Sequence, residues 1–249
     1  MKRLFVLALG LLLPWTAPAF AVEIKVLSAG AVEPGLHKAV EQFKQSSGQQ
    51  VTIEFNTAPQ IGKRLQDGYV ADVVIAPLAV LKPHTDAGKI AGDSQVVLGK
   101  VGIGIVVRND APVPKIATSD DIKAELLAAD SIVFNVASTG LYLERLFERL
   151  GVGAQIKDKS TRPPSGEQVM QTVVAGKGRQ IGFGPITEIK LFEGKGVKFV
   201  GPLPADLQNY TTYAAAPMTN APQREAANAF VAHLQTAAAK QLFSAAGID

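Results

Sequence analysis

The amino-acid sequence predicts an α/β protein with two lobes, each a doubly wound sheet with flanking helices. Apolar strand patterns alternate with helical patterns between residues 24 and 81, and a second series of this kind occupies residues 122–200. Between them, residues 96–107 form a long apolar stretch that is interrupted by Gly99, Gly102 and Gly104. We interpret this stretch as a strand that leaves one lobe and crosses to the other.

The first series begins with a strand at residues 24–27 that ends in the small residues 28–30. Small residues allow another group to approach the backbone closely. Pro34 suits the first turn of the helix that follows, because that turn needs no N–H from it. Strands at 51–55 and 71–76, each followed by a helix, complete the alternation. A ligand crevice is expected at the carboxyl ends of such strands.

The second series contains a strand at residues 131–134, then a turn and a helix for which Ser138 or Thr139 is expected to be the N-cap. Ser165 to Gln168 has the form of a capping box and opens another helix. The predicted division is residues 22–102 plus 201–249 in one lobe and 103–200 in the other. Two crossings between the lobes would create a cleft that can close by hinge motion.

Residues 1–21 have the order of a signal peptide: Lys2 and Arg3, an apolar run, and the small-x-small ending Ala19-Phe20-Ala21. We therefore expect cleavage after Ala21 and a periplasmic location. The chain contains no cysteine, so no disulfide can form.

Charge and length limit the classes of function. The chain has 25 Lys+Arg and 22 Asp+Glu, so removing Lys2 and Arg3 leaves 23 against 22 and a net charge of +1. This near-neutral balance argues against a nucleic-acid partner. The three histidines lie far apart, and no metal spacing, nucleophile elbow or dinucleotide fingerprint occurs. We accordingly predict no metal, no cofactor and no catalytic residue.

Hydroxyl, amide and small residues gather at predicted strand-to-helix turns, where free N–H groups and the helix dipole favour an anion. For any one of these residues, plain helix capping is the alternative. Arg162 could bind a carboxylate through two hydrogen bonds, although an exposed loop charge explains it equally well. The predicted ligand-binding residues are Ser28, Ala29, Gly30, Thr57, Gln60, Ser138, Thr139, Gly140, Gln168, Thr187 and Arg162.

Several segments resemble the periplasmic molybdate-binding proteins of ABC importers, over nearly the whole mature chain. They are I-K-V-L-S-A-G-A-V, V-T-I-E-F-N, K-R-L-Q-D-G-Y-V-A-D-V-V-I-A, S-T-G-L-Y-L-E-R-L and G-E-Q-V-M-Q-T-V. The resemblance implies a type II periplasmic-binding-protein-like fold, a small anionic ligand, an inner-membrane ABC permease as partner, and a monomer.

The ligand site departs from the pattern of that family, which holds a tetrahedral dianion with serines in the first two turns and a late tyrosine. The first serine aligns with Ala31, the second cluster with residues 57–60, and the tyrosine falls near Pro185. Each lost buried donor costs about 1–3 kcal/mol. We therefore expect weaker molybdate binding and a different oxyanion or a small organic carboxylate as rivals.

The leading hypothesis is a substrate-binding protein of an ABC importer, with its ligand in the cleft between the lobes. A periplasmic enzyme that acts on a small anionic substrate with the same two-lobed fold is the alternative. The effector domain of a regulator is a third class, which the signal peptide and the missing DNA-binding segment disfavour.

Overall fold

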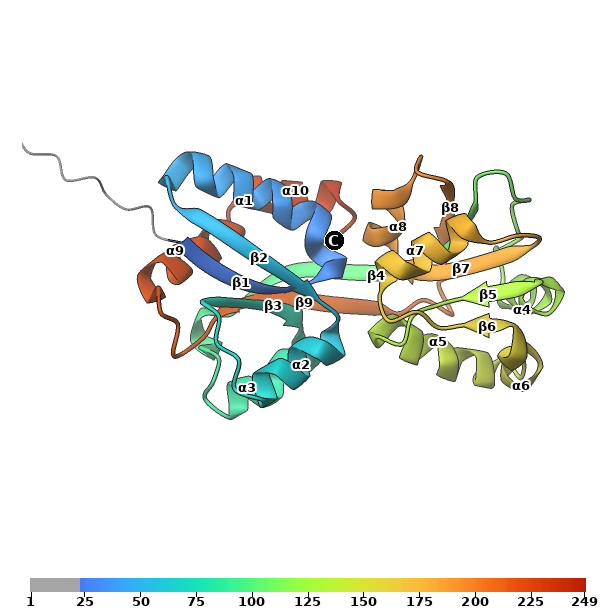
Figure 1. The fold of residues 1–249 in the computed structure, drawn as a ribbon, viewed down its shortest axis with the longest axis horizontal. Coiled ribbons are helices and arrows are strands. Elements are labelled where there is room, and N and C mark those ends of the chain that lie inside the picture. Colours follow the sequence, from blue (N-terminus) through green and yellow to red (C-terminus); the bar gives the residue numbers. More distant parts are fainter. Residues whose placement is uncertain (1–22) are drawn as a thin grey trace, which may run out of the picture.

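The computed structural model describes residues 23–249, which contain ten α-helices and nine β-strands (Figure 1). The predicted signal peptide, residues 1–21, lies outside the described part. No helix within residues 23–249 is long and apolar enough to cross a membrane. The α/β class with two lobes is confirmed.

The first lobe is built on parallel strands, as its strand-helix alternation predicts. Strand β1 lies between β2 and β3 and is parallel to both. The two C-terminal helices pack in the same lobe, because α9 contacts β9 and α10 lies along α1. Its elements are β1 (Glu23–Ala29), the 3-10 turn η1 (Gly30–Val32), α1 (Glu33–Ser47), β2 (Gln50–Asn56), α2 (Ala58–Gln66), β3 (Val73–Pro77), α3 (Leu78–Asp86), η2 (Gly92–Ser94), α9 (Arg224–Leu234) and α10 (Ala237–Ala245).

The second lobe repeats this logic with a smaller sheet. Strand β5 is parallel to both β6 and β7. Its elements are α4 (Ser119–Ala128), β5 (Ser131–Val133), α5 (Ser138–Arg149), α6 (Gly153–Ile156), η3 (Lys157–Lys159), β6 (Ser160–Thr161), α7 (Gly166–Ala175), β7 (Gln180–Pro185), α8 (Ile186–Phe192) and β8 (Val197–Pro202).

Strand β4 (Val96–Arg108) spans both lobes, and β9 (Tyr210–Pro217) pairs with its first-lobe half after the chain has returned from the second lobe. Residues 96–102 of β4 pair with β9, whereas residues 103–108 pair with β7 and β8. The strand order β2-β1-β3-β9-β4-β7-β5-β6 is therefore continuous, because one strand serves both lobes. Figure 1 shows β4 running between the two halves of the molecule.

Separate apolar cores lie on the two sides of this crossing. The first core draws on residues 24–101 and 213–248, and the second lobe has a core on each face of its sheet. Ile105 faces one of these cores and Val106 the other, as the two-residue period of a strand requires. Leu203 and Leu207 pack in the second lobe. We propose that the lobes divide after Gly102 and again between Leu207 and β9.

Candidate functional site

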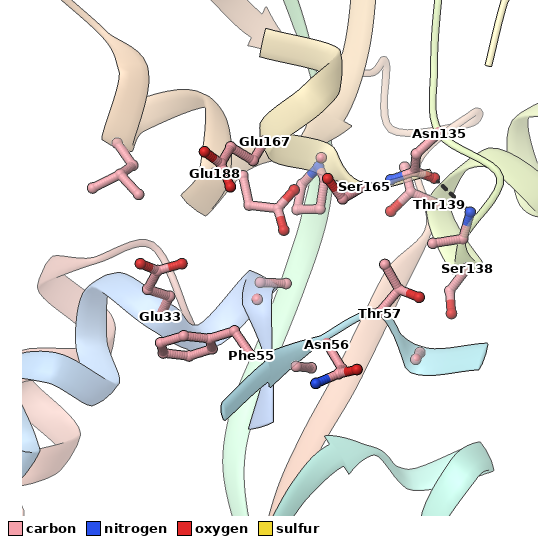
Figure 2. Close-up of a pocket in the computed structure, with 18 of the residues that line it drawn as sticks. Glu33, Phe55, Asn56, Thr57, Asn135, Ser138, Thr139, Ser165, Glu167 and Glu188 are labelled. Carbon is pink, nitrogen blue, oxygen red and sulfur yellow. Dashed lines mark hydrogen bonds between the residues drawn. The ribbon is translucent and has the colours of Figure 1, made fainter. Parts of the chain in front are cut away.

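A cleft of about 340 Å³ lies between the lobes, at the carboxyl ends of β1, β2, β5 and β7. This is where the parallel topology predicts a ligand crevice. Residues from both lobes line it, Tyr213 of β9 among them, and Figure 2 shows several of these side chains. The lining consists of Ala29, Gly30, Ala31, Glu33, Phe55, Asn56, Thr57, Ala58, Gln60, Asn135, Ala137, Ser138, Thr139, Ser165, Gly166, Glu167, Pro185, Glu188, Leu191, Phe192, Lys195 and Tyr213.

The first-lobe wall consists of the turns after β1 and β2. Gly30 opens the 3-10 turn that leads into α1, and Thr57 precedes the first residue of α2. The Thr57 N–H and hydroxyl both donate to Gln60 Oε1, each at 2.9 Å. The Gln60 amide oxygen is thereby used for capping, the alternative that sequence patterns leave open for each of these residues.

Asn135 organises the turn that leads into α5 in the second lobe. Its Oδ1 accepts hydrogen bonds from the N–H groups of Ala137 at 3.1 Å and Gly140 at 2.9 Å. The N-cap is Ala137, so the prediction that Ser138 or Thr139 caps this helix is wrong. Because Asn135 supplies the acceptor from two residues upstream, the hydroxyl of Ser138 is left for the cleft, as Figure 2 shows.

The start of α7 forms the adjoining part of the same wall. Ser165 is the N-cap and accepts a hydrogen bond from the Gln168 N–H at 3.3 Å, as the capping motif predicts. Gly166 and Glu167 follow it into the cleft. The first turns of α5 and α7 thus lie beside the cleft. Free N–H groups at the start of a helix favour a negatively charged group of a ligand.

Three carboxyl groups line the cleft: Glu33 of α1, Glu167 of α7 and Glu188 of α8. Burial raises the pKa of Glu188 to about 7, with smaller contributions from the negative charges of Glu33 and Glu167. Its Oε2 atom is buried and has no hydrogen-bond partner in the described chain. A Cβ atom on residue 166 would lie 1.4 Å from this oxygen, so Gly166 makes the space for it.

Tyr213 is the contribution of strand β9 to the cleft. Its side chain is buried, and this burial together with the nearby Glu188 raises the pKa of its hydroxyl. The hydroxyl therefore stays protonated near neutral pH and can donate a hydrogen bond. Lys195, which follows α8, contributes a positive charge to the lining, opposite to the charge of the three glutamates.

Six of the eleven predicted ligand-binding residues line the cleft: Ala29, Gly30, Thr57, Gln60, Ser138 and Thr139.

The other five residues have different surroundings. Ser28 is fully buried and donates to its neighbour's carbonyl oxygen, while Thr187 donates to the Ala31 carbonyl oxygen at 2.6 Å. Gly140 is needed for close packing, since a Cβ there would lie 1.6 Å from the Asn135 carbonyl oxygen. Gln168 lines a separate, open surface hollow. Arg162 pairs with Glu144 at 2.7 Å.

Sequence patterns do not reveal the acidic part of the lining. The glutamates follow no recurring motif, and they meet only because helices of different lobes converge. Residues 23–249 contain no group of three or more His, Cys, Asp or Glu side chains arranged to hold a metal ion.

Sequence comparisons find relatives across the whole described chain. The family model for bacterial extracellular solute-binding proteins matches residues 24–249. An aconitate isomerase from a Pseudomonas species is 30% identical over 258 residues, which covers 99% of this chain and 96% of that protein.

Solved structures share the fold at lower identity. The molybdate-binding protein of Azotobacter vinelandii has a TM-score of 0.76 at 16% identity, with 91% of this chain and 98% of that chain covered. The sulfate-binding protein of Mycobacterium tuberculosis has a TM-score of 0.73 at 22% identity, with 91% and 86% covered. At these identities the likeness is one of fold. Taken with the family match, the comparisons show that the chain belongs to the bacterial extracellular solute-binding protein family, with the two-lobed fold of molybdate-binding and related periplasmic binding proteins.

Proposed function

We propose that the cleft binds a small organic acid with several carboxyl groups, and that the protein acts as its periplasmic solute receptor. The observation that carries this proposal is the mixed lining of the cleft. Helix N-termini and hydroxyl groups can hold carboxylates, whereas Glu33, Glu167 and Glu188 need hydrogen-bearing or apolar parts of a ligand beside them. An organic acid offers both kinds of surface.

A tetrahedral oxyanion fits this lining poorly. Its oxygens are acceptors, and ionised glutamates are acceptors too. Ala31, Ala58 and Pro185 line the cleft where the resemblance places hydroxyl donors. The missing donors therefore disfavour molybdate, which, unlike an organic acid, also has no C–H surface to place beside the three carboxyl groups.

The full-length relative supports an organic acid as the ligand class. That protein is named for aconitate, and it is related to this chain at 30% identity. The cleft volume of about 340 Å³ falls within the usual range for small-molecule sites, roughly 300–1,000 Å³. We take the cis and trans isomers of aconitate as the first acids to test.

Delivery to an importer completes the proposed role. It includes export with cleavage after Ala21, a monomeric receptor, and an inner-membrane ABC permease that accepts the loaded form. Membership of the extracellular solute-binding family supports this part.

A second candidate function is an isomerase that acts on the same acid. The relative's name favours it, and so does a protonatable carboxyl group, that of Glu188, in the cleft. Because isomerisation changes no mass, NMR rather than mass spectrometry separates this enzyme from a receptor.

Calorimetry with the two acids and with molybdate tests the proposed ligand. We expect one of the acids to bind at least about 100-fold more tightly than molybdate. The cleft lacks two or three hydrogen-bond donors for molybdate, and each missing donor costs about 1–3 kcal/mol of binding free energy. Ser138→Ala should weaken acid binding about tenfold, whereas the exposed Ser244→Ala outside the cleft should leave it unchanged. Tight molybdate binding with no binding of either acid would contradict the proposal.

A further inference from the structure

The carboxyl group of Glu188 occupies a junction between the lobes. It belongs to α8 of the second lobe, yet a Cβ on Gly30 of the first lobe would lie 3.2 Å from its Oε1. On the other side, a Cβ on Gly166 would lie 1.4 Å from Oε2. Two glycines in different lobes thus leave room for one carboxyl group at the cleft wall. Figure 2 shows Glu188 among the side chains of this wall.

This carboxyl group lacks the partners that a structural buried acid would have. Oε2 is buried and accepts no hydrogen bond within the described chain. Buried polar groups are nearly always hydrogen-bonded, and each unpaired one destabilises the folded state. The apolar side chains of Phe55, Leu191 and Phe192 line the same cleft. Oε2 is enclosed, whereas Oε1 is not among the enclosed atoms, so a ligand in the cleft can reach the carboxyl group through Oε1.

We propose that Glu188 is a proton-transfer group, which removes a proton from one carbon of a bound unsaturated polycarboxylic acid and returns it to another. This inference rests on the proposed binding of such an acid in the cleft. It deepens the second candidate function, isomerisation, by describing it as a 1,3 proton shift and naming the residue that performs it.

The shift balances within the protein and the ligand. The Glu188 carboxylate takes a proton from the CH₂ group that lies between a carboxyl group and the C=C bond. The electron pair of the broken C–H bond forms a new C=C bond to the middle carbon. The pair of the old C=C bond then takes the proton back from Glu188 at the far carbon. No oxidant, reductant or coenzyme takes part.

The cleft can hold the charge that develops during the shift. Negative charge spreads onto the ligand carboxyl groups, and the N–H groups at the starts of α5 and α7 lie at the cleft to receive it. The protonated hydroxyl of Tyr213 is a further donor. Each of these groups is fixed by the fold before the ligand arrives, which is the condition for effective stabilisation of a transition state.

The pKa of Glu188 suits this role. At about 7, both the carboxylate that takes a proton and the acid that returns it are present near neutral pH. The charged or titratable groups that interact with it are Glu33 from α1, Glu167 from α7 and Tyr213 from β9. Lys195 after α8 also lines the cleft. The two glutamates raise its pKa, in addition to the effect of burial.

Proton NMR of the two acids in heavy water tests the proposal on the purified protein. We expect the protein to convert one isomer into the other and to introduce deuterium. Glu188→Gln should slow both reactions by about 100-fold or more, the usual contribution of a general base, while calorimetry still detects the bound acid. Glu193→Gln is the matched control, because this exposed glutamate at the end of α8 lies outside the cleft and should leave the rate unchanged.

The pH dependence provides a readout that a structural role would not change. The rate should rise with pH up to about 7, and Glu33→Gln should move this rise to lower pH, because it removes a negative charge. Binding of acid without isomerisation or exchange would overturn this inference alone. Full activity of Glu188→Gln would also overturn it. Absence of acid binding would overturn the proposed ligand and this inference together.

Discussion

At the scale of single residues, Glu188 shows how a site can lower stability. Its pKa is 4.5 in an ordinary setting and about 7 here, so the folded chain keeps a proton that the unfolded chain releases between these values. Proton binding by the folded state alone means that stability falls as pH rises through this window. The loss is at most roughly 3 kcal/mol, from about 1.4 kcal/mol for each pH unit.

Glu188→Gln should remove this pH dependence, since an amide of nearly the same shape carries no charge. We expect the variant to be about 2–3 kcal/mol more stable than the unchanged protein at pH 8, with little difference at pH 4.5. Urea unfolding at the two pH values measures this, and Glu193→Gln serves as the control. An equal difference at both pH values would show that the carboxyl group titrates normally in the folded state.

At the scale of elements, the starts of helices set the shape of the cleft. Ser165 caps α7 from the position that its sequence motif predicts. Helix α5 instead takes its acceptor from Asn135, which receives two N–H groups across the turn. The same close approach requires glycine at position 140, since a side chain there would overlap the Asn135 carbonyl oxygen.

Asn135→Ala should therefore destabilise the protein more than Ser138→Ala. The first substitution leaves two buried N–H groups unpaired, at about 1–3 kcal/mol each. The second removes no capping hydrogen bond, because Ala137 is the N-cap and Asn135 supplies the acceptor, and should change the free energy of unfolding by less than about 0.5 kcal/mol. Urea unfolding of both variants compares them, and a larger loss for Ser138→Ala would mean that Ser138 does cap the helix.

The contrast between these two helices explains what sequence can predict here. Strand-to-helix turns follow from local apolar periodicity, so the first-lobe turns at Gly30 and Thr57 and the second-lobe turn at Ser138 are predictable, and all three line the cleft. The position of Glu188 depends on the approach of Gly30 from the other lobe, and local patterns carry no information about that. For the same reason, local patterns cannot show that the Thr187 hydroxyl is used by a contact with Ala31 of the other lobe rather than by a ligand.

At the scale of the whole molecule, the lobes are joined by two chain crossings and by a contact beside the cleft. The chain crosses between the lobes within β4 and again before β9, and we expect bending at these crossings to open or close the cleft. Thr187 of α8 donates to the Ala31 carbonyl oxygen at 2.6 Å and joins the second lobe to the first. Because both groups are buried, this bond favours the arrangement in which the lobes lie close together.

Thr187→Val tests that contact, because valine keeps the shape and loses the donor. We expect the unpaired Ala31 oxygen to cost about 1–3 kcal/mol, a cost that water can relieve if the lobes separate. The radius of gyration from small-angle X-ray scattering should therefore increase in the ligand-free variant. Thr172→Val is the control, since its hydroxyl bonds to Gln168 within the same helix, at 2.7 Å, and joins no lobes. If Thr187→Val lowers stability but leaves the radius of gyration unchanged, the hydrogen bond stabilises the position of α8 without holding the lobes close together.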